Sequence, residues 1–265
     1  MKYSDQYTLI TGATSGIGYE LAKIFAANGH SLIIVARDEQ ALERVAGELI
    51  QQHGVDVVRI SRDLFDPNNA FSLYDEVKQK NLKVDVLVND AGQGLYGEFA
   101  DTDIQRELDI IHLNISSLVV LTKLFLQDML IAGNGKILNL SSIASKVPGP
   151  WQSVYHGTKA FVQSFSESIR HEMKDRGVTI TALLPGATDT DFFNKAEMLD
   201  SKIVQGNLAD AATVAKDGYD ALMSGDDKVV SGFMNKLQTS MAAITPEPML
   251  AAQMEKQQEP VNHDK

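Results

Sequence analysis

The stretch Tyr7-Thr8-Leu9-Ile10-Thr11-Gly12-Ala13-Thr14-Ser15-Gly16-Ile17-Gly18 decides the fold. An apolar run typical of a buried strand leads directly into a glycine-spaced loop, and a helical pattern begins at Gly16. Glycines let the backbone turn sharply and come close to a pyrophosphate, while the free amides of a helix N-terminus point toward it. An ordinary strand-to-helix turn is the alternative. The residues expected to bind a dinucleotide here are Gly12, Thr14, Ser15, Gly16, Ile17 and Gly18.

Short apolar runs bounded by turn signals alternate with helical patterns along the chain. The expected helices at 16–28, 39–53 and 154–176 end before Gly29, Gly54 and Gly177, since glycine is a frequent left-handed helix stop. This alternation predicts an α/β fold, a single Rossmann-type doubly wound domain with a mostly parallel sheet of about seven strands. Ligands then bind beyond the carboxyl ends of the strands. The expected strands lie at residues 7–10, 32–35, 55–60, 84–88, 136–140, 178–184 and 228–230.

Composition narrows the classes of partner. The 265 residues are 44% hydrophobic and 22% charged, as in one globular domain, and the net charge of −11 argues against nucleic acid or an anionic membrane. The chain has no cysteine, and its six histidines form no close cluster, so we expect neither a disulfide nor a metal site. No secretory signal and no apolar stretch near the roughly 20 residues of a membrane span is evident. We expect a cytoplasmic protein.

A second motif is Tyr155-His156-Gly157-Thr158-Lys159, with Ser142 thirteen residues before the tyrosine. Residues four apart lie on one face of a helix, so the Lys159 ammonium can sit beside the Tyr155 phenol. A phenol has a pKa of about 10, and a nearby positive charge favours its phenolate form. The pair is therefore a candidate proton-transfer device, although an ordinary amphipathic helix would often contain the same spacing.

Strand ends supply further candidate ligand contacts. An acidic residue at the end of the second strand suits a ribose 2′-hydroxyl, whereas an arginine suits a 2′-phosphate. Arg37 therefore favours NADP(H) over NAD(H), although Arg37 can also be a solvated loop residue and the neighbouring Asp38 complicates the sign. Asp63 is placed to meet the adenine amino group. The remaining small or apolar residues expected beside the adenosine are Leu64, Asn89, Ala91 and Gly92.

Together, these motifs resemble the classical short-chain dehydrogenase/reductase (SDR) family, in order from Thr11 to Thr190 and over about the first three quarters of the chain. The resemblance implies that Asn89 stabilises the central sheet and that Tyr155 and Lys159 also contact the cofactor. It implies a catalytic tetrad of Asn114, Ser142, Tyr155 and Lys159. It also implies a stretch that binds the nicotinamide carboxamide, formed by Pro185, Gly186, Thr188 and Thr190.

The activity implied is an NADP(H)-dependent interconversion of a ketone or aldehyde and an alcohol by hydride transfer. Tyr155 would be the general acid or base, Ser142 would hydrogen-bond the oxyanion, and Lys159 would hold the ribose and lower the phenol pKa. Asn114 would bind a water in a proton relay. A turn-capping serine and a buried asparagine that satisfies backbone groups are the respective alternatives for Ser142 and Asn114. An NADP(H)-sensing binding protein on the same fold is the alternative function.

The chain departs from the family pattern at Asp90, which stands where asparagine or alanine is usual. Residues 187–210 correspond to the substrate lid. An apolar pocket for the carbonyl or alcohol substrate can be lined by five residues, which can also simply pack: Phe192, Phe193, Trp151, Pro148 and Tyr96. The family also implies a homodimer or homotetramer.

The end of the chain differs from the family's usual finish. Apolar residues at helical spacing predict a C-terminal helix over roughly 232–254, which completes a single domain spanning residues 1–254. Residues 255–265 are expected to be a polar, frayed tail. The apolar residues that define the helix are Phe233, Leu237, Met241 and Ile244.

Overall fold

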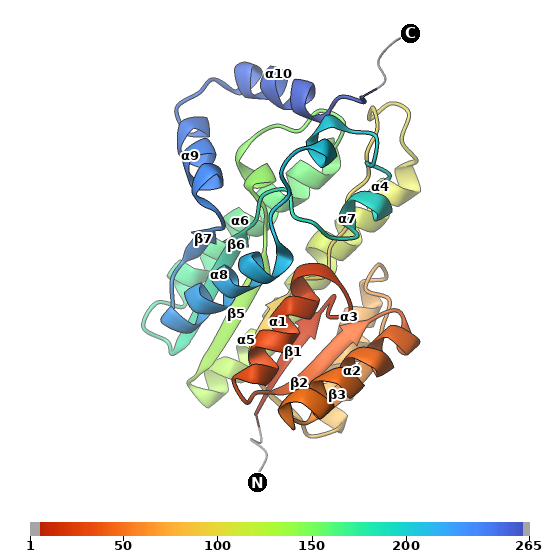
Figure 1. Ribbon diagram of the computed structural model, residues 1–265. Helices are drawn as coiled ribbons and strands as arrows, with labels where there is room; N and C mark the ends of the chain where they lie inside the picture. The colour runs from red at the N-terminus through yellow and green to blue at the C-terminus, as the bar shows by residue number, and fades with distance from the viewer. Residues whose placement is uncertain (1–5, 262–265) are drawn as a thin grey trace.

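The computed structural model describes residues 6–261, and a seven-stranded sheet forms its centre (Figure 1). Every strand pair is parallel, in the order β3-β2-β1-β4-β5-β6-β7, so the Rossmann-type α/β fold is confirmed. Each of the seven predicted runs is a strand. Their bounds are β1 (Gln6–Thr11), β2 (Ser31–Ala36), β3 (Val57–Ser61), β4 (Lys83–Asn89), β5 (Gly135–Leu140), β6 (Val178–Leu184) and β7 (Lys228–Val230).

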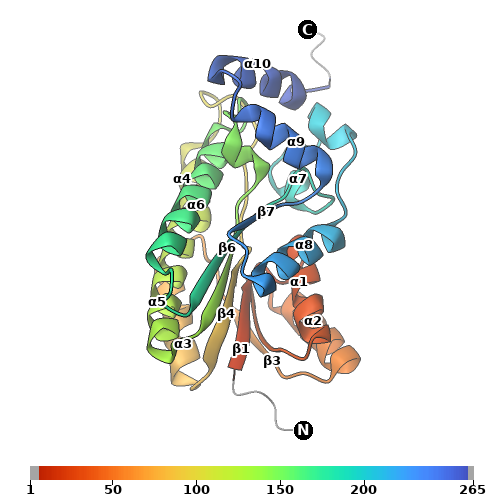
Figure 2. The same ribbon diagram turned by 90° about the vertical axis from the view of Figure 1, so that its left-hand side faces the viewer.

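Helices cover both faces of the sheet, as Figure 2 shows edge-on. Successive strand residues point to opposite faces, so Leu9 and Ile10 enter different hydrophobic cores and both are buried. This is why the strand sequences are continuously apolar. One face carries α1 (Gly16–Ala27), α2 (Glu39–His53) and α8 (Ala211–Ser224); the other carries α3 (Asn68–Gln79), α5 (Leu118–Ala132) and α6 (Ser153–Glu172).

Helix ends follow local signals in two cases and depart from them in a third. Gly29 follows α1 by two residues and Gly54 ends α2 with a φ of 66°. Helix α6 ends at Glu172, several residues before the expected stop at Gly177, and Asp175 in the intervening turn has a φ of 65°. A left-handed residue cannot continue a right-handed helix, so the turn replaces the last predicted helical residues.

The C-terminal segment corrects the expectation of one helix over 232–254. Two helices form, α9 (Phe233–Ala242) and α10 (Glu247–Gln258), because Pro246 restricts the residue before it and begins a new helix. The polar tail expected from residue 255 is helical through Gln258, which is 2% exposed. Residues 262–265 lie outside the described residues.

The predicted lid, residues 187–210, forms a compact excursion above the carboxyl ends of the strands. It contains α7 (Phe192–Lys195) and the 3-10 turn Lys202–Gln205. A parallel bridge between Thr188 and Ala209 closes its base. In both ribbon views α9 and α10 lie at this same end of the molecule, so the lid and the C-terminus share one edge of the sheet (Figures 1 and 2).

One helical run, Ile104–Ala132, is long and apolar enough to cross a membrane by length and composition. It comprises α4 (Ile104–Ile111), the π-helical turn His112–Ser117 and α5. In this structure α5 packs on the sheet and buries Leu121 and Phe125 in the second core. The expected absence of a membrane span, the cytoplasmic location and the homo-oligomeric state stay predictions.

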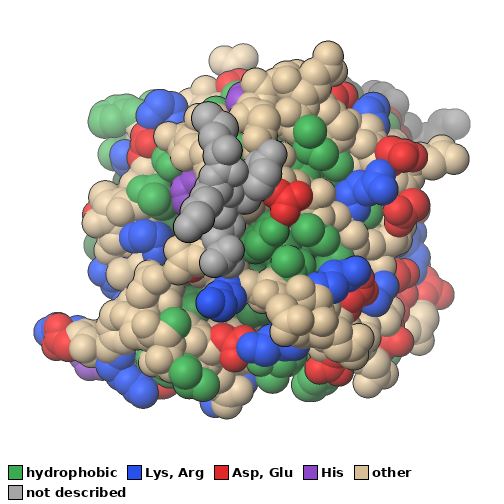
Figure 3. All heavy atoms as spheres, turned by 90° about the horizontal axis from the view of Figure 1, so that it is seen from below, with side chains coloured by type: hydrophobic (Ala, Val, Ile, Leu, Met, Phe, Trp, Pro, Cys, Tyr) green, Lys and Arg blue, Asp and Glu red, His purple; other side chains and the backbone are tan. Residues whose placement is uncertain are grey.

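Figure 3 shows the end of the molecule at which the described chain begins. Acidic and basic side chains are interspersed over the part of this face that is not covered by grey atoms. Charges of both signs are therefore mixed on this face.

The packing of α5 can be tested with two truncations on the same helix. Phe125 is 1% exposed and Ile131 is 87% exposed. Phe125→Ala should lower the free energy of unfolding by about 3–5 kcal/mol, because it removes a buried ring and leaves a cavity. Ile131→Ala should change it by less than about 0.5 kcal/mol. Urea denaturation checks both, and equal effects would contradict the packing described.

Candidate active site

The site is built at the junction of the neighbouring strands β1 and β4. The Thr11 hydroxyl at the end of β1 accepts hydrogen bonds from the backbone amides of Asp90 and Ala91, each at 3.1 Å. It donates to the carbonyl of Val88 at 3.4 Å. One side chain therefore ties the glycine loop to the turn that follows β4.

The glycine loop has no room for side chains. Gly12 and Gly16 have φ values of 74° and 57°, and a Cβ on Gly12 would lie 2.9 Å from Asp90 Oδ2. A Cβ on Gly18 would lie 2.5 Å from the Gly12 carbonyl oxygen and would overlap the Asp90 carboxylate. This close backbone, opening onto the N-terminus of α1, is the cradle that a dinucleotide pyrophosphate requires, so the residues present fit such a cofactor.

At the end of β2, the structure separates the roles of two neighbouring charges. Asp38 caps α2, because its Oδ1 accepts hydrogen bonds from the amides of Gln40 and Ala41 at 2.9 and 3.1 Å. The Arg37 guanidinium lies over the ring of Phe65, 4.9 Å from its centroid, and lines the pocket. One carboxylate oxygen of Asp38 is therefore engaged by the helix, while Asp38, like Arg37, lines the pocket. The sequence contained a signal for this role, because aspartate is a preferred residue at the N-cap position immediately before a helix.

Two other charges near the expected adenosine site also have protein partners. Arg62 pairs with Glu76 at 2.5 Å. Asp63 accepts a hydrogen bond from the Phe65 amide at 3.2 Å, and the Leu64 carbonyl accepts one from Ser117. Both Asp63 and Leu64 line the pocket, as predicted.

Asn89 does not line the pocket, and it acts within the sheet. Its amide nitrogen donates to Thr122 at 3.0 Å and to Asn139 at 2.9 Å, which joins β4 to α5 and β5. Asn139 in turn donates to Ser166 on α6 at 2.9 Å. This buried network matches the sheet-stabilising role that the sequence motif implies.

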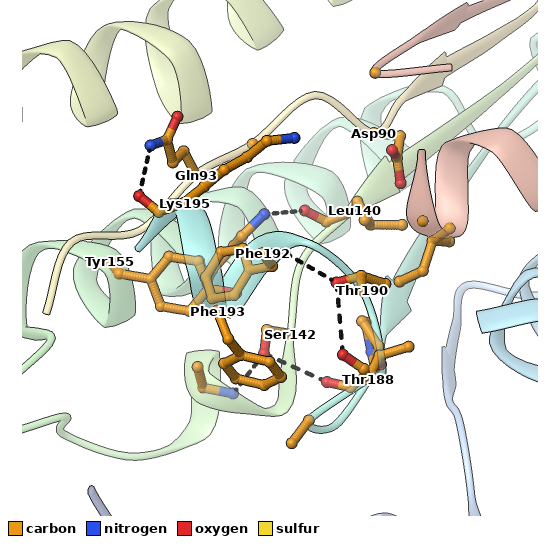
Figure 4. Close-up of a pocket in the computed structure, with 18 of the residues that line it drawn as sticks. Asp90, Gln93, Leu140, Ser142, Tyr155, Thr188, Thr190, Phe192, Phe193 and Lys195 are labelled. Atoms are coloured by element: carbon orange, nitrogen blue, oxygen red, sulfur yellow. Dashed lines mark hydrogen bonds between the residues drawn. The ribbon is translucent and has the colours of Figure 1, made fainter. Parts of the chain in front are cut away.

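Ser142 and Tyr155 converge in the pocket from β5 and α6 (Figure 4). The Ser142 hydroxyl accepts from the Ala144 amide at 3.1 Å and donates to the Pro185 carbonyl at 3.3 Å, so it also caps the following turn. Burial raises the pKa of Tyr155 to about 12, while a hydrogen bond with Ser142 acts in the opposite direction. Ser142 therefore caps the turn, and its expected role toward an oxyanion stays a prediction.

Lys159 differs in one respect from the expectation. Its ammonium donates to the Leu140 carbonyl at 2.8 Å and lies 5.7 Å from the centroid of the Tyr155 ring. Burial lowers the pKa of Lys159 to about 8, although the carboxylate of Asp90 raises it. The expected lowering of the phenol pKa by Lys159 is not seen here: burial raises the pKa of Tyr155, and the hydrogen bond with Ser142 opposes that rise.

Asp90 is the buried carboxylate opposite this ammonium. Burial raises its pKa to about 7, while Lys159 and a hydrogen bond from the Gly18 amide lower it. Its Oδ1 is shielded from solvent and has no hydrogen-bond partner among the described residues. Asp90 and Lys159 therefore stabilise each other's charge in a site that burial makes unfavourable for both.

Asn114 sits in the π-helical turn behind the pocket wall and is 2% exposed. Its Oδ1 accepts from the Gln93 amide at 3.0 Å, and its Nδ2 donates to the Gln93 carbonyl at 2.9 Å and to Thr158 at 3.0 Å. These contacts fit an asparagine that satisfies backbone groups, and the expected part of Asn114 in a proton relay stays a prediction. It holds the loop after β4 against α6.

The predicted nicotinamide-binding stretch borders the pocket after β6. Pro185, Gly186, Thr188 and Thr190 all line it. Thr188 donates to the Gly186 carbonyl at 2.9 Å, and Thr190 accepts from the Phe192 amide at 3.3 Å (Figure 4). A Cβ on Gly16 would lie 3.0 Å from Thr190 Cγ2, so this stretch closes onto the glycine loop.

The lid places two aromatic side chains in the pocket beside Tyr155. Phe192 packs against Tyr155 with ring centroids 5.1 Å apart, and both it and Phe193 line a cavity of about 1100 Å³ (Figure 4). Gln93 tethers the lid by donating to the Lys195 carbonyl at 3.1 Å. Of the five residues expected to line an apolar pocket, Phe192 and Phe193 do so, whereas Tyr96, Pro148 and Trp151 are not among the lining residues.

The polar lining residues that sequence reasoning missed include three that are buried, Gln152, His156 and Gln258. His156 lies inside the quoted pentapeptide but carried no assigned role. Gln152 and Gln258 gave no signal, because a glutamine in a polar segment is usually exposed. Their burial follows only from the way α10 folds back onto the start of α6.

Comparison with known proteins shows the protein family to which the chain belongs. The family model described as short chain dehydrogenase matches residues 6–199. The mouse (Mus musculus) dehydrogenase/reductase SDR family member 7B is 32% identical over 252 residues, which cover 90% of this chain and 77% of the relative. Sulfoacetaldehyde reductase 2 of Chromohalobacter salexigens is 38% identical over 186 residues, covering 69% and 73% of the two chains.

A solved short-chain dehydrogenase from Sphingobium yanoikuyae, in complex with NADPH, has a TM-score of 0.81 and 26% sequence identity, covering 90% of this chain and 94% of that chain. The chain belongs to the short-chain dehydrogenase/reductase family. It is accordingly an oxidoreductase of the class that acts on alcohols and carbonyl compounds with a nicotinamide cofactor.

The raised pKa of Asp90 has a consequence for stability. The folded chain binds more protons than the unfolded chain between about pH 4 and pH 7, so ionisation of Asp90 lowers stability as the pH rises through this window. Asp90→Asn should therefore gain stability relative to the native chain from pH 4 to pH 7, by about 4 kcal/mol, because the pKa of Asp90 lies roughly three units above its ordinary value and one unit is worth about 1.4 kcal/mol.

Urea denaturation across that pH range measures the difference. Asp101→Asn, at an exposed turn, is the control and should show a difference that is nearly independent of pH. A flat difference for Asp90→Asn as well would show that Asp90 is ionised throughout the window.

Proposed function

We propose that this protein is an NADPH-dependent carbonyl reductase that interconverts a ketone or aldehyde and the corresponding alcohol. The observation that carries the proposal is the convergence of Ser142, Tyr155 and Lys159 on one pocket, which the glycine loop and the Pro185–Thr190 stretch also line. A binding protein that only senses the cofactor would not need this set of proton-transfer groups.

The bound nicotinamide supplies the hydride in the reductive direction. Tyr155 then donates its phenolic proton to the carbonyl oxygen, and its raised pKa keeps that proton in place at neutral pH. The Ser142 hydroxyl turns from the long bond to Pro185 and donates to the same oxygen, on which negative charge develops. Lys159, still largely protonated near pH 7, stabilises the phenolate that forms.

The preference for NADP(H) rests on the end of β2. Asp38 is engaged as the cap of α2 and Arg62 is paired with Glu76, which leaves Arg37 as the charge that faces the expected 2′-phosphate. The Arg37 guanidinium lies over the Phe65 ring, 4.9 Å from its centroid. The Sphingobium yanoikuyae relative in complex with NADPH supports the same preference.

The proposal predicts that Tyr155→Phe loses turnover. NADPH oxidation with a panel of ketones, aldehydes and quinones should fall by at least about 100-fold, because the variant lacks the proton donor. Binding of NADPH, followed by its fluorescence, should be retained. Tyr219→Phe, whose ring packs on Phe25 on the far side of α1, is the control and should keep its activity. Full turnover by Tyr155→Phe would reject the mechanism.

Cofactor choice is tested at Arg37. Arg37→Ala should weaken NADPH binding by roughly 10- to 100-fold, since a charge-assisted hydrogen bond is worth about 1.5–3 kcal/mol, and should leave NADH binding nearly unchanged. Arg62→Ala removes a neighbouring charge of the same sign that is already paired. Arg62→Ala should change the ratio of NADPH affinity to NADH affinity by less than about threefold. If both variants lose NADPH affinity equally, the preference arises from the net positive charge of the region and not from Arg37.

A further inference from the structure

Three buried polar side chains converge on one wall of the pocket, and the proposed reaction uses none of them. Gln152 and His156 come from the start of α6, while Gln258 is the last residue of α10. All three are less than one tenth exposed and line the pocket. Gln258 lies beyond residues 6–199, the part of the chain that the family model matches.

The protonation of His156 sets the orientation of its neighbours. Nδ1 lies 2.9 Å from the Val147 carbonyl oxygen, which can only accept, so Nδ1 carries the hydrogen. Burial lowers the pKa of His156, and the carbonyls of Val147 and Ala144 oppose this only in part, so the ring is neutral near pH 7. Nε2 is therefore an acceptor. A Cβ on Gly149 would overlap the ring, so the backbone there packs directly against it.

The two amides are oriented by this acceptor in turn. Gln258 Nε2 lies 3.1 Å from His156 Nε2 and must be the donor. The same amide group faces Gln152 Oε1 at 3.5 Å, which turns the Gln152 nitrogen away. One donor and one acceptor remain, Gln152 Nε2 and Gln258 Oε1, and both are buried without a hydrogen-bond partner among residues 6–261.

Leaving these atoms unpaired is costly, yet the structure holds them in place. A buried polar atom without a partner costs about 1–3 kcal/mol. Gln258 is nevertheless held at its backbone carbonyl by the Tyr96 hydroxyl at 2.5 Å. Lys202 of the lid pairs with Glu259, and Ser201 bridges Pro260. The C-terminal helix is thus fastened to the lid in the position that presents the Gln258 amide to the pocket.

The free donor lies beside the catalytic tyrosine. A Cβ on Gly94 would lie 3.1 Å from Gln152 Nε2, 3.4 Å from Tyr155 Cδ2 and 2.9 Å from Phe192 Cζ, so the three side chains meet above this glycine. Phe192, from the lid, packs on Tyr155 (Figure 4). A substrate whose carbonyl reaches Tyr155 therefore comes close to Phe192 and to the Gln152 amide.

We propose that Gln152 and Gln258 form a recognition subsite for a hydroxyl group on the substrate, so that the protein acts on hydroxylated carbonyl compounds. This rests on the proposed carbonyl reductase function. A hydroxyl both accepts, here from Gln152 Nε2, and donates, here to Gln258 Oε1. A carboxylate, phosphate or sulfonate only accepts and would face the Gln258 oxygen beside a neutral histidine. A plain alkyl group would leave both amides unpaired.

The test uses the 2-, 3- and 4-hydroxycyclohexanones, each matched with the methylcyclohexanone of the same substitution. Equilibrium binding is measured by ligand-observed NMR in the presence of NADP⁺, which cannot reduce a ketone, and NADPH consumption is measured separately. At least one hydroxy isomer should bind at least about tenfold more tightly than its methyl partner, because a buried site built to hydrogen-bond a hydroxyl rejects the analogue that lacks it.

Gln258→Leu and Gln152→Leu should each bring that binding ratio to about one. Gln253→Leu, at an exposed position of the same helix α10, should keep it. The two glutamines come from separate helices, so either variant decides the matter if the other does not fold. The subsite is overturned if no isomer shows the preference or if the leucine variants retain it. Binding preference without any turnover would sustain the subsite and reject the reductase instead.

Discussion

The arrangement of the site depends on the close approach of the glycine loop to the turn after β4. Thr11 accepts two backbone amides from that turn, and the absence of side chains at Gly12 and Gly18 lets the two segments touch. Because β1 and β4 are neighbours although they are not consecutive, this is where the strand order changes direction and where a crevice opens. The phosphate cradle and the proton-transfer groups both line this crevice.

The same close approach explains the electrostatics of the pocket. Asp90, Lys159 and Tyr155 are all shielded from water, and burial moves the pKa of each toward its neutral form, to about 7, about 8 and about 12. The charged forms of Asp90 and Lys159 are therefore stabilised by each other and not by solvent. A tyrosine that keeps its proton, beside a lysine that can stabilise the phenolate, is suited to donating that proton to a carbonyl.

The C-terminal segment closes one side of the pocket. Helices α9 and α10 follow the part of the chain that the family model matches, and the end of α10 reaches back to the lid and to the start of α6. The glycine loop and the residues expected to bind the cofactor lie within the matched part. The wall beside Tyr155 includes residues of the C-terminal segment, and selectivity among carbonyl compounds is expected to arise there.

The sequence by itself determined the parts of this protein that depend on local patterns. Alternating apolar runs and helical periodicity predicted the seven strands, the glycine spacing predicted the cradle, and four-residue spacing placed Tyr155 and Lys159 on one helix face. Only the tertiary structure decided what each polar group contacts. Asp38 accepts hydrogen bonds from the α2 amides, and Asn114 accepts one from Gln93. Burial raises the pKa of Tyr155, and folding brings Gln258 to His156, which is 102 residues away in the chain. The reason is physical: periodicity is a property of neighbouring residues, whereas burial and hydrogen-bond partners arise from packing between elements distant in the chain.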